Sequence, residues 1–93
     1  MKRQKFNSVW DALEDTPQEA ENMKLRAALM RQLRKHIEAQ EWKQADAAAK
    51  LSVTQPRVSD LMRGKIERFS LDMLVNMSTA AGLKVSVRVA EPA

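Results

Sequence analysis

Hydrophobic positions in the middle of the chain recur at helical spacing in two short runs, which a polar break separates. Residues 45–51 and 55–62 are rich in helix-favouring side chains, and residues 52–54 interrupt the pattern between them. Thr54 is suited to an N-cap, and Pro56 falls in the first helical turn, where its missing N–H costs nothing. The pattern predicts two short helices that pack along a seam of Ala47, Ala48, Leu51, Val53, Val58 and Leu61.

The second of these helices carries polar side chains on its outer side. We expect Ala48 to lie where the two helices cross most closely, because a larger side chain there would push the helices apart. Gln amides and Arg guanidinium groups can form paired hydrogen bonds with base edges in the major groove of DNA. The two helices therefore predict a helix-turn-helix unit whose second helix reads DNA.

Individual roles follow from the chemistry of the second helix. Gln55 is expected to contact a base, since Gln can bond bidentately to adenine. Arg57 and Arg63 could reach guanine or phosphates, and Ser59 is suited to either a base or a phosphate. Asp60 would repel phosphate, so it either accepts from a cytosine amine or orients Arg57 or Arg63, each three residues away. We favour the orienting role.

Further DNA contacts are expected on both sides of this helix. Gln44 opens the first helix, where its amide and the backbone N–H groups can meet a phosphate; the alternative is a capping role alone. Gly64 ends the second helix, and Lys65 and Arg68 follow in a loop suited to phosphates. The predicted DNA-binding residues are Lys43, Gln44, Thr54, Gln55, Pro56, Arg57, Ser59, Asp60, Arg63, Lys65 and Arg68.

The segments that flank this unit also have helical signatures. Thr16, Pro17 and Glu19 form a strong helix start with a capping box, and helical periodicity continues to about Gln40, with a break near Asn22 as an alternative. Ser70 is expected to cap a last helix, which runs to about Ala81 and stops at Gly82. The apolar stripe of the first flanking helix comprises Met23, Ala27, Met30, Leu33 and Ile37, widened by Leu25 and Leu29.

Several isolated residues have both a structural and a functional interpretation. For Trp42 we favour a role as a core plug over stacking on DNA, and for His36 we favour packing, because no second ligand or nucleophile accompanies it. Phe6, Val9, Trp10 and Leu13 have the spacing of a short amphipathic turn. We expect them to fold back on the core, with a docking surface for a partner protein as the alternative.

The last apolar segment alternates with period two, which is the pattern of a β-strand. Leu83, Val85, Val87 and Val89 alternate with Lys84, Ser86 and Arg88. A lone strand must find a partner for its backbone groups, and no comparable second strand exists in the chain. We expect antiparallel pairing with the same strand of a second subunit; an N-terminal extended segment or a strand of a bound toxin are alternatives.

The stretch from residue 44 to 63, QADAAAKLSVTQPRVSDLMR, resembles the helix-turn-helix of the Cro/phage-repressor (XRE-type) family. Gln44, Ala48, Gln55 and Ser59 match common positions of that family, whereas Ser52 stands where the family usually has Gly. Ser52 would then carry a left-handed backbone at some strain, or the turn would differ slightly. The longer run QPRVSDLMRGKIERFSLDMLVNMSTAAGL is similar to the HigA-like antitoxins, which implies repression of a shared operon and binding of a small, basic RelE-type toxin.

Composition narrows the class of protein. The 93 residues, 44% of them hydrophobic, favour one domain near the small end for a self-sufficient core, so we expect a homodimer. Residues 43–68 carry six basic and three acidic side chains, which places most of the net +4 around the predicted DNA-binding unit. Without cysteine, with one histidine and with no metal or nucleotide motif, we expect neither an enzyme nor a cofactor.

These features predict a mainly α, four-to-five-helix, Cro/repressor-like domain with one C-terminal β-strand that pairs across a dimer. Residues 1–15 are expected to form an N-terminal extension, residues 16–82 the DNA-binding domain and residues 83–93 the dimerisation strand and tail. The expected partners are double-stranded operator DNA, a second copy of the chain and a small basic toxin. With no signal-like or long apolar segment, we expect no membrane contact and a cytoplasmic location. A regulator without a toxin and a protein-interaction module are the alternatives.

Overall fold

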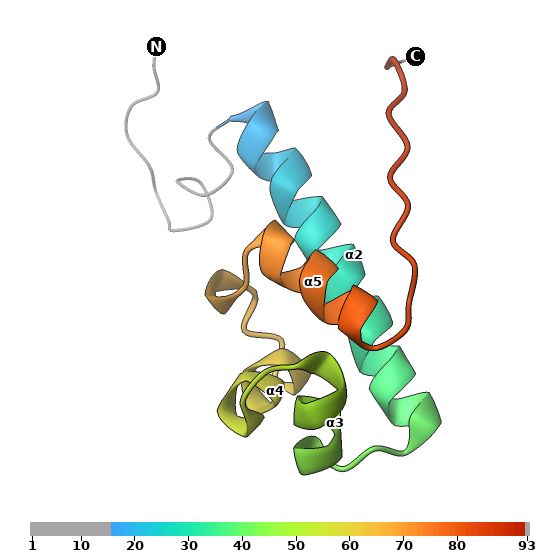
Figure 1. Ribbon diagram of the computed structural model, residues 1–93. Helices are drawn as coiled ribbons and strands as arrows, with labels where there is room; N and C mark the ends of the chain where they lie inside the picture. Colours follow the sequence, from blue (N-terminus) through green and yellow to red (C-terminus); the bar gives the residue numbers. More distant parts are fainter. Residues whose placement is uncertain (1–15, 93) are drawn as a thin grey trace.

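Four α-helices and one 3₁₀ turn follow one another in the computed structural model, which describes residues 16–92 (Figure 1). The predicted helices are confirmed, and the loop after the second short helix contains a 3₁₀ turn that was not predicted. Apolar residues of Phe6–Leu13, for which we expected an amphipathic turn, lie outside the described residues. The elements are α2 (Pro17–Gln40), α3 (Gln44–Leu51), α4 (Gln55–Met62), η1 (Ile66–Arg68) and α5 (Leu71–Ala80).

The longest element, α2, begins where its sequence places a cap. Thr16 Oγ1 accepts a hydrogen bond from the backbone N–H of Glu19 at 3.1 Å, and Pro17 is the first helical residue. The helix is continuous, so the break considered near Asn22 does not occur. It ends at Gln40 and is capped by Glu41, a non-glycine residue in the left-handed conformation, with φ 57° and ψ 36°. This helix is the scaffold against which α4, η1 and α5 pack.

The turn between α3 and α4 has the backbone geometry that its family resemblance implied. Ser52 adopts φ 60° and ψ 43°, so serine carries the left-handed conformation that glycine would otherwise supply. The turn is closed by a hydrogen bond from Val53 N–H to Ala48 O at 3.0 Å. Thr54 Oγ1 then caps α4 by accepting from Arg57 N–H at 3.4 Å, as predicted.

A single apolar core joins the four α-helices and the segment after η1. Ala48 and Leu51 of α3 meet Val58 and Leu61 of α4 in this core, which confirms the predicted seam. Trp42 packs partly buried against the same core, with its ring edge-to-face to His36 at 5.3 Å between centroids. Both residues therefore have the packing roles that we favoured. The buried apolar residues are Met30, Leu33, Ile37, Ala47, Ala48, Leu51, Val58, Leu61, Phe69, Leu74 and Met77.

The last helix crosses the middle of α2 and closes with local caps at both ends (Figure 1). Ser70 Oγ accepts from Met73 N–H at 3.1 Å, which confirms its predicted N-cap role. Ser78 is buried and donates its hydroxyl to Leu74 O at 2.8 Å, so its polar group is satisfied within the helix. Gly82, with φ 87°, ends the turn that follows α5.

The C-terminal segment differs from the expectation of a β-strand. Residues 83–92 have no regular secondary structure and run back beside α2, so no β-ladder forms within residues 16–92 (Figure 1). Leu83 and Val85 are half-buried, whereas Val87 and Val89 are 61% and 95% exposed. The physical reason is that a β-strand needs a neighbouring strand for its backbone hydrogen bonds, and the described residues offer none. Within the same residues, no helix is long and apolar enough to cross a membrane.

Candidate nucleic-acid interface

Helix α4 has one apolar face and one polar face. Val58 and Leu61 are fully buried, while Gln55 at the start of the helix and Arg63 at its C-cap are exposed. Of the other predicted DNA-binding residues, Lys43, Gln44, Thr54, Pro56 and Arg68 are exposed as well, and Arg57, Ser59, Asp60 and Lys65 are half-buried. The predicted residues thus lie on α4 and on the segments beside it, and the side chains of Arg57 and Asp60 also make contacts within the protein.

The N-terminus of α3 presents backbone donors next to this face. Gln44 is the first helical residue and is exposed, and the N-cap Lys43 makes no side-chain capping hydrogen bond. First-turn N–H groups of a helix have no intrahelical partner and attract anions. Asp46 lies in the same turn and counteracts part of this attraction. The arrangement fits a single phosphate contact through Gln44 and the backbone.

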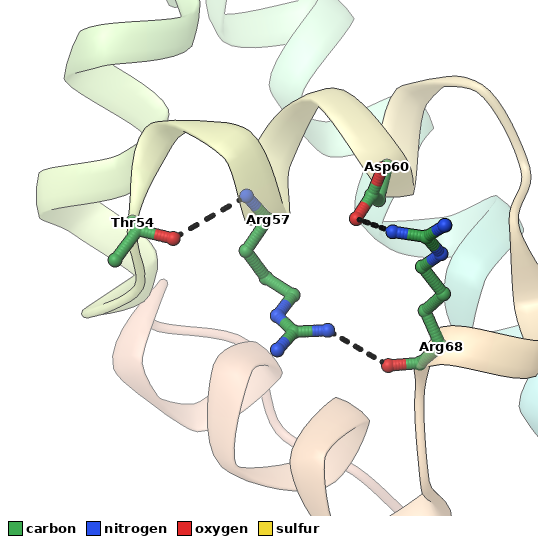
Figure 2. A network of polar contacts seen from close by, with 4 residues as sticks. All are labelled: Thr54, Arg57, Asp60 and Arg68. Carbon is green, nitrogen blue, oxygen red and sulfur yellow. Dashed lines mark hydrogen bonds and ion pairs between the residues drawn. The ribbon is translucent and has the colours of Figure 1, made fainter.

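A network of polar contacts connects α4 to the turn that follows it (Figure 2). Arg57 Nη1 donates to the carbonyl oxygen of Arg68 at 2.9 Å, and Arg68 Nη1 donates to Asp60 Oδ2 at 3.4 Å. The predicted partners of Asp60 were wrong: its carboxylate pairs with Arg68 from the next turn, and neither Arg57 nor Arg63 is its partner. The side chains of Arg68 and Asp60 are 53% and 16% exposed, so the acid is sheltered while the guanidinium faces solvent.

Arg57 has a second contact that limits its freedom. Its guanidinium lies over the ring of Phe69, 5.5 Å from the centroid, in addition to the hydrogen bond to Arg68 O. Phe69 is 1% exposed and belongs to the core. Arg57 is therefore fixed at the edge of the polar face of α4, although a guanidinium with five donors retains groups for further hydrogen bonds.

The turn after α4 is built by local backbone contacts. Gly64 has φ 74°, which confirms that it ends the helix, and Lys65 N–H donates to Asp60 O at 3.0 Å. The 3₁₀ turn η1 then leads Arg68 back past α4. Lys65 and Arg68 are thereby held close to α4.

One residue of this region has no signal in the sequence. Arg26 of α2 donates from Nη1 to the carbonyl oxygens of Ile66 and Phe69, at 3.3 and 3.2 Å. Its Nε donates to Asn22 Oδ1 at 2.7 Å, one helical turn earlier. The spacing of Asn22 and Arg26 suits a pair on one helix face. Nothing in the sequence shows that the guanidinium reaches a turn 40 residues away.

The described residues contain no group of three or more His, Cys, Asp or Glu side chains that could hold a metal ion. The polar side chains of α4 and of the turns beside it are mainly amide, hydroxyl, ammonium and guanidinium groups. Such groups recognise phosphates and base edges.

Comparisons with known proteins agree with this geometry. A family model described as "Helix-turn-helix domain" matches residues 12–90. No curated protein matches the chain. Among solved structures, the chain is similar to one described as "Putative XRE Family Transcriptional Regulator", with 31% sequence identity and a TM-score of 0.73. That similarity covers 80% of this chain and 83% of the other. The chain belongs to the helix-turn-helix domain family and has the XRE-type fold.

Proposed function

We propose that the protein is a sequence-specific, DNA-binding transcriptional regulator that represses its own promoter. The observation that carries the proposal is the exposed polar face of α4, with Gln55 at its start and Arg63 at its end, above a fully buried Val58 and Leu61. Gln44 on one side and the turn with Lys65 and Arg68 on the other supply phosphate-binding groups. Membership of the helix-turn-helix family and the similarity to a structure described as a transcriptional regulator support the same function.

In this mode of binding, α4 enters the major groove. Gln55 reads a base, Arg63 contacts a guanine or a phosphate, and Ser59 contacts either one. Lys43, Thr54 and Pro56 lie beside the backbone of the DNA, and Arg57 and Asp60 hold the neighbouring turn in place. The excess positive charge of residues 43–68 makes the binding sensitive to salt.

We further propose that the regulator acts as a symmetric dimer joined through residues 83–89. The large apolar residues that are exposed in residues 16–92 are Leu25, Val87 and Val89. Leu25 and Val87 line an apolar groove of about 340 Å³ between α2, α5 and the C-terminal segment. Antiparallel pairing of two such segments would cover these residues and satisfy the strand backbone, and it would place two copies of α4 about 34 Å apart, one turn of DNA.

A finer proposal concerns the biological partner. Residues 55–83 resemble HigA-like antitoxins, so we propose that the operon also encodes a small, basic RelE-type toxin that this protein neutralises. Purification of the protein together with the product of the neighbouring gene tests this. A stable complex that suppresses the ribonuclease activity of that product supports the antitoxin function. A neighbouring product that neither binds nor is inhibited leaves a free-standing regulator.

The main proposal is tested by fluorescence anisotropy on the DNA upstream of the gene and on a scrambled duplex, across a series of salt concentrations. We expect tight binding to the upstream DNA and weak, steeply salt-dependent binding to the scramble. Equal affinity for both duplexes at every salt concentration would contradict sequence-specific regulation. Absence of binding to either would indicate that the helices serve a protein-interaction module.

A further inference from the structure

The 3₁₀ turn that follows the recognition helix is held from two sides by arginines of different helices. We propose that Arg26 of α2 is a positioning residue for DNA binding, which fixes the turn of residues 65–69 so that Lys65 and Arg68 face the phosphates next to α4. This inference rests on the proposed function, because a positioning role for Arg26 requires that the turn it holds contacts DNA.

The contacts of Arg26 lock its guanidinium in place. Its Nε is tied to Asn22 Oδ1 at 2.7 Å, and its Nη1 donates to Ile66 O at 3.3 Å and to Phe69 O at 3.2 Å. The two carbonyl groups belong to the beginning of η1 and to the residue after it. One side chain of α2 therefore contacts the carbonyl groups at both ends of the turn.

The turn is also held by side chains of α4. Arg57 Nη1 donates to Arg68 O at 2.9 Å, and Asp60 accepts from the side chain of Arg68 at 3.4 Å. Together with Arg26, these contacts engage the backbone carbonyls of three residues in the four-residue segment 66–69. Figure 2 shows the α4 half of this arrangement.

Apolar packing holds Ile66 and Phe69, at the two ends of this segment, against the core. Phe69 is 1% exposed, whereas Lys65 and Ile66 are half-buried and Glu67 and Arg68 are exposed. Apolar packing thus fixes where the turn returns to the core but leaves the direction of Arg68 to polar contacts. A side chain that binds phosphate loses less conformational entropy when its backbone is already held in the bound geometry. Arg26 supplies that constraint from the scaffold helix.

The test compares two charge-matched variants of α2, Arg26→Met and Arg31→Met. Arg31 is exposed on the same helix, so its replacement removes the same charge without touching the turn. We expect Arg26→Met to bind both the upstream DNA and a scrambled duplex several-fold more weakly than Arg31→Met. Its salt slope should fall by about one, the value for one lost phosphate contact. If Arg26→Met does not fold, Arg26→Lys retains the charge and removes the forked donor.

A second measurement locates the effect without DNA. Amide hydrogen exchange of Arg26→Met should accelerate at residues 66–69 while α3 and α4 keep the protection of the wild type. Adding Arg26→Met to the double variant Lys65→Ala/Arg68→Ala should not weaken binding further, because Arg26 acts through the two side chains of the turn.

The outcomes separate the two proposals. Equal affinity and equal salt slope for Arg26→Met and Arg31→Met would overturn the positioning role while the DNA-binding function stands. Uniform loss of amide protection would also overturn it, because Arg26 would then support the whole fold. A wild type that binds no DNA would defeat both proposals, and faster exchange in the turn would then show a purely structural clamp.

Discussion

Some polar residues of α4 face solvent, whereas others make contacts that hold the neighbouring turn in place. Gln55 and Arg63 are exposed, whereas Arg57 and Asp60 make contacts within the protein. All four could be assigned to one helix from the sequence, because they lie within nine residues of one another. The partner of Asp60 could not be predicted, since Arg68 follows a turn whose path depends on Gly64 and on the burial of Phe69.

Replacing Gln55 with alanine should impair reading of one base. We expect Gln55→Ala to cost about 1–3 kcal/mol on the cognate site and to relax the base preference at one position. Binding to a panel of single-base operator variants measures this.

Lys65→Ala is the comparison for that experiment, because Lys65 is proposed to contact phosphate. It should weaken binding to all sequences alike and lower the salt slope by about one. If Gln55→Ala weakened all sequences equally, the base-reading role would be wrong.

Replacing Ser52 with glycine should stabilise the turn between α3 and α4. Ser52 has φ 60°, a conformation that costs a residue with a Cβ atom about 1–2 kcal/mol. Glycine avoids this cost but loses more entropy on folding, so we expect Ser52→Gly to raise the free energy of unfolding by about 0.5–1 kcal/mol. Chemical denaturation measures the change.

The matched control is Ala49→Gly in α3, the helix that Ser52 caps, because residue 49 is exposed and helical. This variant should lower the free energy of unfolding by about 0.5–1 kcal/mol. A loss of stability in both variants would show that Ser52 is unstrained.

For the helices and turns, the sequence features that predicted the structure correctly were the N-cap residues and the spacing of apolar residues. Thr16, Thr54 and Ser70 each accept the expected backbone hydrogen bond, because a cap acts over three residues and needs nothing from the rest of the fold. The 3₁₀ turn η1 carried no comparable signal. Its backbone is set by contacts to α2 and α4, which lie outside its own sequence.

The packing of α3 on α4 can be tested at Ala48. This residue is 9% exposed and belongs to the core, so a larger side chain has to displace its neighbours. We expect Ala48→Leu to lower the free energy of unfolding by about 1–3 kcal/mol and to weaken DNA binding, since α4 would shift relative to α3.

Ala49→Leu introduces the same side chain one position along the helix, on the exposed side. It should leave both stability and affinity close to those of the wild type. Equal destabilisation by the two variants would place the helix crossing elsewhere.

For the whole molecule, the feature without a partner in the described residues is the apolar groove formed by α2, α5 and the C-terminal segment. Leu25 and Val87 line its groove and are 38% and 61% exposed, and Val89 lies two residues further on. Exposed apolar side chains that gather on one side favour an interface. A second subunit would cover them and give the segment the strand partner that it lacks.

Val87→Asp should therefore abolish the dimer, because it places a charge in the proposed interface. We expect the variant to elute as a monomer and to bind the upstream DNA much more weakly, since only one recognition helix per molecule remains. Sedimentation or light scattering measures the oligomeric state.

Ala90→Asp adds the same charge at an exposed position on the alternate side of the segment. It should remain dimeric. A Val87→Asp variant that stays dimeric would refute the strand-pairing proposal.

By itself, the sequence determined the four helices, their caps, the core seam and the exposed residues of α4, because these depend on periodicity and on groups a few residues apart. Only the tertiary structure decided the contacts that span elements: Asp60 with Arg68, Arg57 with the carbonyl of Arg68, and Arg26 with the turn 40 residues away. It also decided that residues 83–92 form no strand within residues 16–92. Such outcomes depend on which surfaces meet in space, and a strand exists only where a second strand accepts its hydrogen bonds.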